Sequence, residues 1–214
     1  MASPDESKAY STPHWDPVRG RTAIVLIDLQ NDFLHEDGWY AKSGIDISHM
    51  RRVIEPTQEL IRVAREADVP IIWTRHGFVN EKDAGPYMQF RSFYKDGGLR
   101  IGTWGFDVYE EFEVADEDWV IEKSRLSSFF NTKLDVILRG IDAETVIHTG
   151  VVTNQCVAAT SKDAMYRNYK AIVVEDCVGA SITRLHEPAL DMMRVGWADV
   201  QTLPEIVAAL EKMK

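Results

Sequence analysis

Three residues able to carry out covalent catalysis each stand after an apolar run of the chain: Asp28, Lys123 and Cys156. Those runs are typical of buried strands, and the carboxyl ends of parallel strands meet at the sheet edge where ligands bind. A carboxylate, an ammonium and a thiol are therefore expected in one crevice. There Cys156 would attack a carbonyl, and Asp28 would take the thiol proton and later deliver it to the leaving nitrogen. Lys123 would keep both anions charged and orient the acid.

Each of these three residues also has a purely structural interpretation. Asp28 could cap a helix, Lys123 could be a solvated charge at a strand end, and Cys156 could be a small buried core residue. The start of a helix, where Cys156 is expected, favours thiolate over thiol because the N-terminus of a helix is electropositive. Taken singly, each structural interpretation is preferred. Three such residues at equivalent positions of the fold favour catalysis.

The elements that must position these residues follow an alternation of apolar strands and helices. This alternation predicts an α/β fold, a three-layer sandwich around a six-stranded parallel sheet with right-handed connections. The predicted strands are 22–27, 69–74, 119–122, 145–149, 171–175 and 199–201. The predicted helices are 48–67, 131–139 (closed by Gly140), 157–168, 186–195 and 203–212. The stretch 75–105 is rich in glycine, and a loop of that length indicates a functional role.

Length and composition limit the classes of protein that fit. The 214 residues fit one domain, 21–214, preceded by an N-terminal arm, 1–20. A net charge of −10 makes nucleic acid and anionic membranes poor partners. Only two cysteines, Cys156 and Cys177, indicate reduced thiols and the cytoplasm rather than a disulfide scaffold. The chain shows no apolar segment typical of a signal peptide and no run that would span a bilayer.

Two motifs and the lysine between them carry a resemblance to a known family. The segment 28–33 (DLQNDF) is similar to the opening motif of the isochorismatase-like cysteine hydrolases, and 150–157 (GVVTNQCV) resembles their nucleophile motif. Lys123 matches the family lysine, and the similarity runs from Thr22 to the last helix. The resemblance implies a Rossmann-like sheet of six parallel strands and a cysteine–aspartate–lysine triad that hydrolyses C–N bonds.

The same resemblance implies a specific backbone arrangement next to the nucleophile. The peptide bond between Val151 and Val152 is expected to be cis. The backbone N–H groups of Val152 and Cys156 are then expected to form an oxyanion hole.

Branch-specific features narrow the substrate class. Nicotinamidases of this superfamily hold a metal through an aspartate and two histidines after the second strand, whereas segment 73–78 has only His76, so we expect neither metal nor cofactor. Isochorismate-cleaving members lack the nucleophile that Cys156 supplies here. Segment 123–135 and the pair Trp104-Gly105 resemble the ureidoacrylate amidohydrolases of pyrimidine breakdown. Because Arg75 and His76 depart from that branch, ureido acids, biuret-like compounds, carbamoyl compounds and simple amides all remain open as substrates.

Further residues are candidates for substrate binding, each with a structural alternative. Gln30 and Asn31 would bond substrate or order the loop after the first strand. Arg75 would pair with a substrate carboxylate or form a structural ion pair. We expect His76 to be a pocket or loop residue rather than a metal ligand, and Cys177 to be uninvolved. The aromatic residues that would wall the pocket, or else belong to the core, are Phe33, Tyr87, Trp104 and Phe130.

The predicted function is a cysteine-dependent amidohydrolase that cleaves a small ureido compound or carboxamide through a thioester-type acyl-enzyme and releases ammonia. One alternative is a non-catalytic or redox-sensing thiol protein on the same fold, although a sensor would need a resolving cysteine near Cys156. The other is a vinyl-ether hydrolase of the isochorismate type. A homo-oligomer is expected, because relatives of this branch commonly form one and the aromatic loop 85–104 needs cover.

Overall fold

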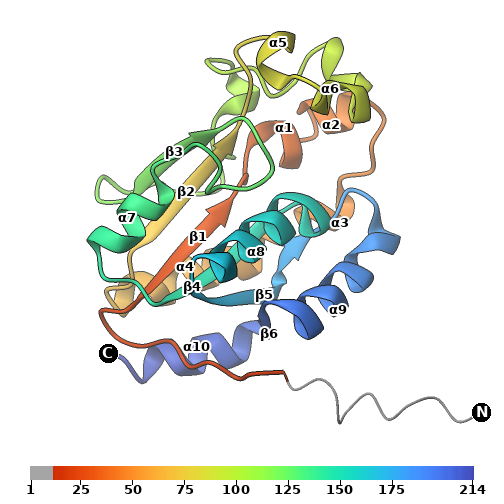
Figure 1. Cartoon of the computed structure of the whole chain (residues 1–214). Helices are drawn as coiled ribbons and strands as arrows, with labels where there is room; N and C mark the ends of the chain where they lie inside the picture. Colours follow the sequence, from red (N-terminus) through yellow and green to blue (C-terminus); the bar gives the residue numbers. More distant parts are fainter. Residues whose placement is uncertain (1–11) are drawn as a thin grey trace, which may run out of the picture.

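The computed structural model describes residues 12–214, so residues 1–11 of the predicted N-terminal arm lie outside the described part. Its centre is a six-stranded parallel sheet, as predicted (Figure 1). The strands lie in the order β3-β2-β1-β4-β5-β6. The strands are β1 (Thr22–Ile27), β2 (Ile71–His76), β3 (Trp119–Lys123), β4 (Thr145–Val151), β5 (Lys170–Gly179) and β6 (Asp199–Gln201). Every residue of β1 and β4 is buried, which is typical of central strands in a parallel sheet. β1 is apolar after its first residue, whereas β4 also buries Thr145, His148 and Thr149.

Helices cover both faces of the sheet, and the sheet separates two apolar cores. One core lies under α4 (Ile54–Glu66) and α10 (Leu203–Glu211). The other lies under α7 (Leu134–Gly140), α8 (Ala158–Tyr166) and α9 (His186–Gly196) (Figure 1). In the part of the chain from residue 12 onward, no helix is both long and apolar enough to cross a membrane.

The carboxyl edge of the sheet is covered by short helices rather than by open loops. Two of them follow β1, and two lie within the predicted loop 75–105, which is thus partly helical. Figure 1 shows these four helices gathered beyond the carboxyl end of β1. They are α1 (Asn31–Leu34), α2 (Trp39–Lys42), α5 (Glu81–Ala84) and α6 (Tyr87–Phe90), with 3₁₀ turns at Ser92–Lys95 and Trp104–Phe106.

Three predicted helix boundaries were wrong. The predicted helix 48–67 is broken into α3 (Ser48–Arg51) and α4. The predicted helix 131–139 begins only at Leu134, because Asn131 adopts a left-handed φ of 55° and the Thr132 hydroxyl accepts from the Leu134 N–H. The predicted helix 157–168 is preceded by a wide π-type turn, Thr153–Val157, which contains the nucleophile candidate.

Candidate active site

Asp28 stands where β1 ends, and its backbone leaves the strand abruptly. Its φ of 55° lies in the left-handed region, which aspartate adopts more readily than most non-glycine residues. The side chain is fully buried. The Thr74 hydroxyl donates to Asp28 Oδ1 at 2.9 Å, which fixes the plane of the carboxylate from the neighbouring strand β2.

Lys123 is the last residue of β3, and its ammonium links the other two members of the trio. Its Nζ lies 2.7 Å from Asp28 Oδ2 and 3.3 Å from Cys156 Sγ. It also donates to the carbonyl oxygens of Arg125 at 3.1 Å and Leu126 at 3.2 Å. These four contacts hold the buried ammonium between the Asp28 carboxylate and the Cys156 sulfur.

Cys156 sits in the π-type turn between β4 and α8, at the carboxyl edge of the sheet. The approach to this turn needs Gly150, since a Cβ there would lie 2.0 Å from the Ile27 carbonyl oxygen. The Val151–Val152 peptide bond is cis, as the resemblance implied. The structure thus brings Asp28, Lys123 and Cys156 into one buried cluster.

The charge states in this cluster differ from the expectation that a helix start would favour the thiolate. Burial raises the pKa of Cys156 to about 12, and the nearby Lys123 ammonium offsets only part of that rise. Burial likewise raises the pKa of Asp28 against the opposing effect of Lys123. Burial alone would lower the pKa of Lys123, but the Asp28 carboxylate, with a smaller contribution from Cys156, outweighs it and leaves that pKa raised. The resting site therefore holds a neutral Cys156 thiol, the Lys123 ammonium and the Asp28 carboxylate. The raised pKa of Asp28 makes this carboxylate a better proton acceptor.

His76, at the end of β2, completes the cluster and was not assigned to it from the sequence. Its Nδ1 lies 3.8 Å from Cys156 Sγ and 4.0 Å from Asp28 Oδ2. Donor atoms of Asp28, His76 and Cys156 all lie within 4.8 Å of one another, a spacing that a metal ion could use. The Lys123 ammonium, however, already contacts two of the three, so a cation there would have to displace it.

Gln30, Asn31 and Phe33 order the chain after β1. The Gln30 side chain accepts from the His76 N–H at 2.7 Å and donates to the carbonyl oxygens of His76 and Phe106. Asn31 Nδ2 donates to the Trp104 carbonyl oxygen at 2.8 Å. Phe33 is buried, with its ring 4.7 Å from that of Tyr40. These bonds agree with the alternative that Gln30 and Asn31 order the loop after the first strand.

Arg75 forms structural ion pairs, the second of its two interpretations. Its guanidinium pairs with Asp107 at 3.3 Å and Glu122 at 3.0 Å and lies over the Phe106 ring. Neighbouring residues of a strand point to opposite faces, so Arg75 faces away from the side that Thr74 and His76 share. The expectation that Arg75 would be available for a substrate carboxylate does not agree with these contacts.

The predicted aromatic wall divides into buried and exposed members. Tyr87 is half-buried, with its ring 5.8 Å from His76. Trp104 is 44% exposed and packs edge-on against His35, and Phe130 is 57% exposed. Near Tyr87 lie two buried tyrosines that sequence reasoning missed, Tyr40 and Tyr94, whose hydroxyls share a hydrogen bond at 2.6 Å.

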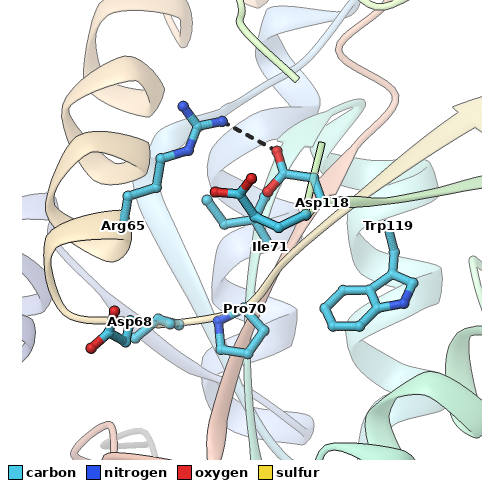
Figure 2. A pocket seen from close by; sticks show the side chains of 8 residues that line it. Arg65, Asp68, Pro70, Ile71, Asp118 and Trp119 are labelled. Carbon is cyan, nitrogen blue, oxygen red and sulfur yellow. Dashed lines mark hydrogen bonds and ion pairs between the residues drawn. The ribbon is translucent and has the colours of Figure 1, made fainter. Parts of the chain in front are cut away.

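A hollow at the opposite edge of the sheet has a different character. Figure 2 shows its lining residues where β2 and β3 begin, with Arg65 paired to Asp118 at 3.2 Å. Asp118 also accepts from the Trp73 indole N–H at 2.8 Å. These polar groups already hold the strand starts together, and ligands of open α/β sheets bind at the carboxyl edge instead.

The comparison with known protein families agrees with this geometry. Residues 22–205, nearly all of the sheet and its helices, match the isochorismatase domain. The chain belongs to the isochorismatase family. Among solved structures, the family fold recurs in a cysteine hydrolase from Pseudomonas syringae pv. phaseolicola, with a TM-score of 0.87 and 25% identity. That likeness covers 95% of this chain and 99% of the other.

Named family members with similar sequences act on nitrogen-containing substrates. A ureidoacrylate amidohydrolase RutB from Acinetobacter baylyi is 28% identical over 85% of this chain and 82% of its own length. The same enzyme from Cronobacter sakazakii is 30% identical over 73% of each chain. The structure of an N-carbamoylsarcosine amidase from Thermoplasma acidophilum matches with a TM-score of 0.71 and 28% identity, covering 86% of this chain and 96% of that one.

Proposed function

We propose that this protein is a cysteine-dependent amidohydrolase that cleaves the C–N bond of a small ureido compound or carboxamide. The observation that carries the proposal is the position of one ammonium, Lys123 Nζ, 2.7 Å from the Asp28 carboxylate and 3.3 Å from the Cys156 sulfur. This arrangement supports a nucleophile, a proton carrier and a fixed positive charge at one point.

The proposed reaction begins with a neutral thiol. Cys156 Sγ attacks the substrate carbonyl carbon while its proton passes to Asp28, forming a C–S bond and an oxyanion. The backbone N–H groups of Val152 and Cys156 are the proposed donors to that oxyanion. Collapse of this intermediate breaks the C–N bond as Asp28 returns the proton to the leaving nitrogen. The leaving amine or ammonia departs, and an acyl-enzyme remains on sulfur.

Water completes the cycle. Asp28 accepts a proton from water as the hydroxyl attacks the acyl carbon, and the thiolate leaves and recovers that proton. A carboxamide gives ammonia in the first half-reaction and a carboxylic acid in the second. A ureido compound with a terminal carbamoyl group gives an amine first and then carbamate, which decays to ammonia and carbon dioxide.

The names of the relatives support the ureido class over simple amides. Ureidoacrylate and N-carbamoylsarcosine, the substrates in those names, both carry a carbamoyl nitrogen. The decisive experiment is an ammonia-release screen over ureido acids, carbamoyl amines, biuret and small carboxamides. Turnover of a ureido compound that is lost in Cys156→Ala supports the proposal. Fast cleavage of a simple carboxamide alone would instead indicate a general amidase.

The second cysteine supplies a matched control and bears on the redox-sensing alternative. Cys177 belongs to the apolar core on the other side of the sheet from Cys156, and both thiols are free. A disulfide between them would require the sheet to open. Cys177→Ala should therefore keep full turnover, whereas Cys156→Ala should lose it by a factor on the order of 10⁴ or more.

We further propose that the protein acts as a homo-oligomer in the cytoplasm. Two unpaired cysteines suit a reducing compartment. Large apolar side chains are exposed at Val79 and Phe90, within the segment between β2 and β3, and at Phe130. In the proposed oligomer a second subunit would cover these side chains. Light scattering at micromolar concentration tests this, and a monomeric mass would contradict it.

A further inference from the structure

His76 contacts the reacting groups but has no part in the reaction described so far. It ends β2, the strand that lies between β1, which carries Asp28, and β3, which carries Lys123. The ring is buried at 1% exposure, with Nδ1 3.8 Å from Cys156 Sγ and 4.0 Å from Asp28 Oδ2. The ring also packs against two aromatic rings, with centroids 5.1 Å from Phe78 and 5.8 Å from Tyr87.

The surroundings keep this imidazole neutral. Burial lowers the pKa of His76 well below its usual value, and the positive charges of Lys123 and Arg125 lower it further. A neutral imidazole carries one proton, on either nitrogen. A lone pair on Nδ1 would face the Asp28 carboxylate and the sulfur, so the favourable tautomer carries its proton on Nδ1. Nε2, which has no hydrogen-bond partner among the described residues, is then the unprotonated nitrogen.

We propose that His76 is a positioning residue for the nucleophile, whose Nδ1–H donates to Cys156 Sγ as the thiol proton passes to Asp28. The proposal rests on the proposed function for its catalytic meaning. His76 keeps its proton throughout, so the only proton that moves is the one from sulfur to carboxylate. Lys123 donates to the same sulfur from 3.3 Å. Two donors, one charged and one neutral, then hold the developing thiolate in a fixed direction.

Three substitutions separate this role from others. His76→Asn places an amide N–H near the position of Nδ1, His76→Gln places one near Nε2, and His76→Phe keeps the ring without either nitrogen. The measurement is the rate of alkylation of Cys156 by iodoacetamide between pH 6 and 10, with the modified cysteine identified by peptide mass. No substrate is needed, so the result does not depend on the reaction assigned to the enzyme.

The Phe and Gln variants should be alkylated about three- to ten-fold more slowly at pH 8. One hydrogen bond changes the thiolate population by a factor of about ten, and the higher nucleophilicity of a more basic sulfur offsets part of that loss. The Asn variant should stay within about two-fold of the wild type, because it restores the donor. Where a ureido substrate is turned over, kcat should follow the same order with KM nearly unchanged.

Other patterns would overturn the proposal. A wild-type rate in the Phe variant, equal losses in all three variants, or rescue by Gln rather than Asn would each do so. If the Phe variant does not fold, as judged by circular dichroism, the comparison of Asn with Gln decides alone. The ammonia-release screen could show no turnover while His76→Asn alone keeps the wild-type alkylation rate. That result would reject the proposed reaction and keep the proposed role of His76.

Discussion

Lys123 reaches past a whole strand to meet Asp28. Lys123 ends β3 and Asp28 directly follows β1. These strands are not neighbours in the sheet, yet Lys123 Nζ lies 2.7 Å from Asp28 Oδ2. Both side chains are fully buried, so each is the other's main charge compensation. The pair consequently contributes to both the chemistry and the stability of the sheet edge.

Replacing one partner alone should be costly to the fold. Lys123→Met leaves the Asp28 carboxylate buried without a counterion, and we expect a loss of about 3–5 kcal/mol in the free energy of unfolding. The double variant Asp28→Asn/Lys123→Met removes both charges and should recover much of that loss while staying inactive. Urea unfolding at pH 7.5 measures both effects. A single variant as stable as the wild type would show that the pair is not charge-coupled.

The contacts of two arginines predict a change of selectivity for one variant and none for the other. Arg75 is paired with Asp107 and Glu122, so Arg75→Ala should change kcat/KM by less than about three-fold on acidic and neutral substrates alike. Arg125, whose carbonyl oxygen accepts from Lys123, has no carboxylate within 4.0 Å of its guanidinium among residues 12–214. Arg125→Ala should lower kcat/KM for an acidic ureido substrate about 10- to 150-fold, the value of one charge-assisted contact.

Both arginine variants are compared by one measurement, the ratio of kcat/KM between an acidic substrate and its neutral amide analogue. Only the Arg125 variant should change that ratio. Equal losses on both substrates would mean that Arg125 acts through its bonds to the carbonyl oxygens of Asp83 and Ser124 rather than through the ligand.

Stability should fall in mild acid because a buried histidine resists protonation. Burial lowers the pKa of His148 to about 4, against the opposing effect of its bond to the Ile172 carbonyl oxygen. The unfolded chain takes up this proton near pH 6.5, so the stabilisation is complete above pH 6.5 and is lost as the pH falls towards 4. The loss is on the order of 3 kcal/mol.

His148→Val provides the test of this linkage. Unfolding free energies measured in urea at pH 7.5 and pH 4.5 should differ less in the variant than in the wild type. His186, whose pKa burial also lowers to about 4, remains in the variant and keeps part of the acid sensitivity. An unchanged difference between the two pH values would exclude a contribution from His148.

Activity should not require a metal ion. The Lys123 ammonium stands between the Asp28 carboxylate and the Cys156 sulfur, where it supplies the positive charge of the site. Prolonged treatment with a chelator, followed by removal of the chelator, should leave turnover within about two-fold of the untreated enzyme. Loss of activity that zinc or iron restores would contradict this prediction and direct attention to the donors of Asp28, His76 and Cys156.

The residues that follow apolar strands could be predicted from the sequence because parallel strands present their carboxyl ends at one edge. Asp28, Lys123 and Cys156 were found in this way. The pairing of Arg75 with Asp107 and Glu122 could not be predicted. It depends on the path of the chain between Arg75 and Asp107, which are 32 residues apart, and on the register of β2 against β3. The raised pKa of Cys156 was missed because a helix start is visible in the sequence and complete burial is not.

The alternation of side chains along a strand could have placed His76 in the site. Thr74 and His76 alternate with Arg75 along β2, so the contact of Thr74 with Asp28 implies that His76 shares its face. Tyr40 and Tyr94 could not be predicted in this way. They come from short segments whose packing depends on all the short helices that cover the carboxyl edge of the sheet.

The strand that delivers the ammonium is one of the two edge strands of the sheet. β3 lies at the margin of the sheet, pairs with β2 alone, and leaves Trp119 and Val120 partly open to solvent. Edge strands detach from a sheet at a lower free-energy cost than central strands. Warming or mild denaturant would therefore uncouple Lys123 from the other two groups while the remaining five strands stay paired. The working lifetime of the enzyme would then be set by how long this outermost strand stays attached, and inactivation would run ahead of denaturation.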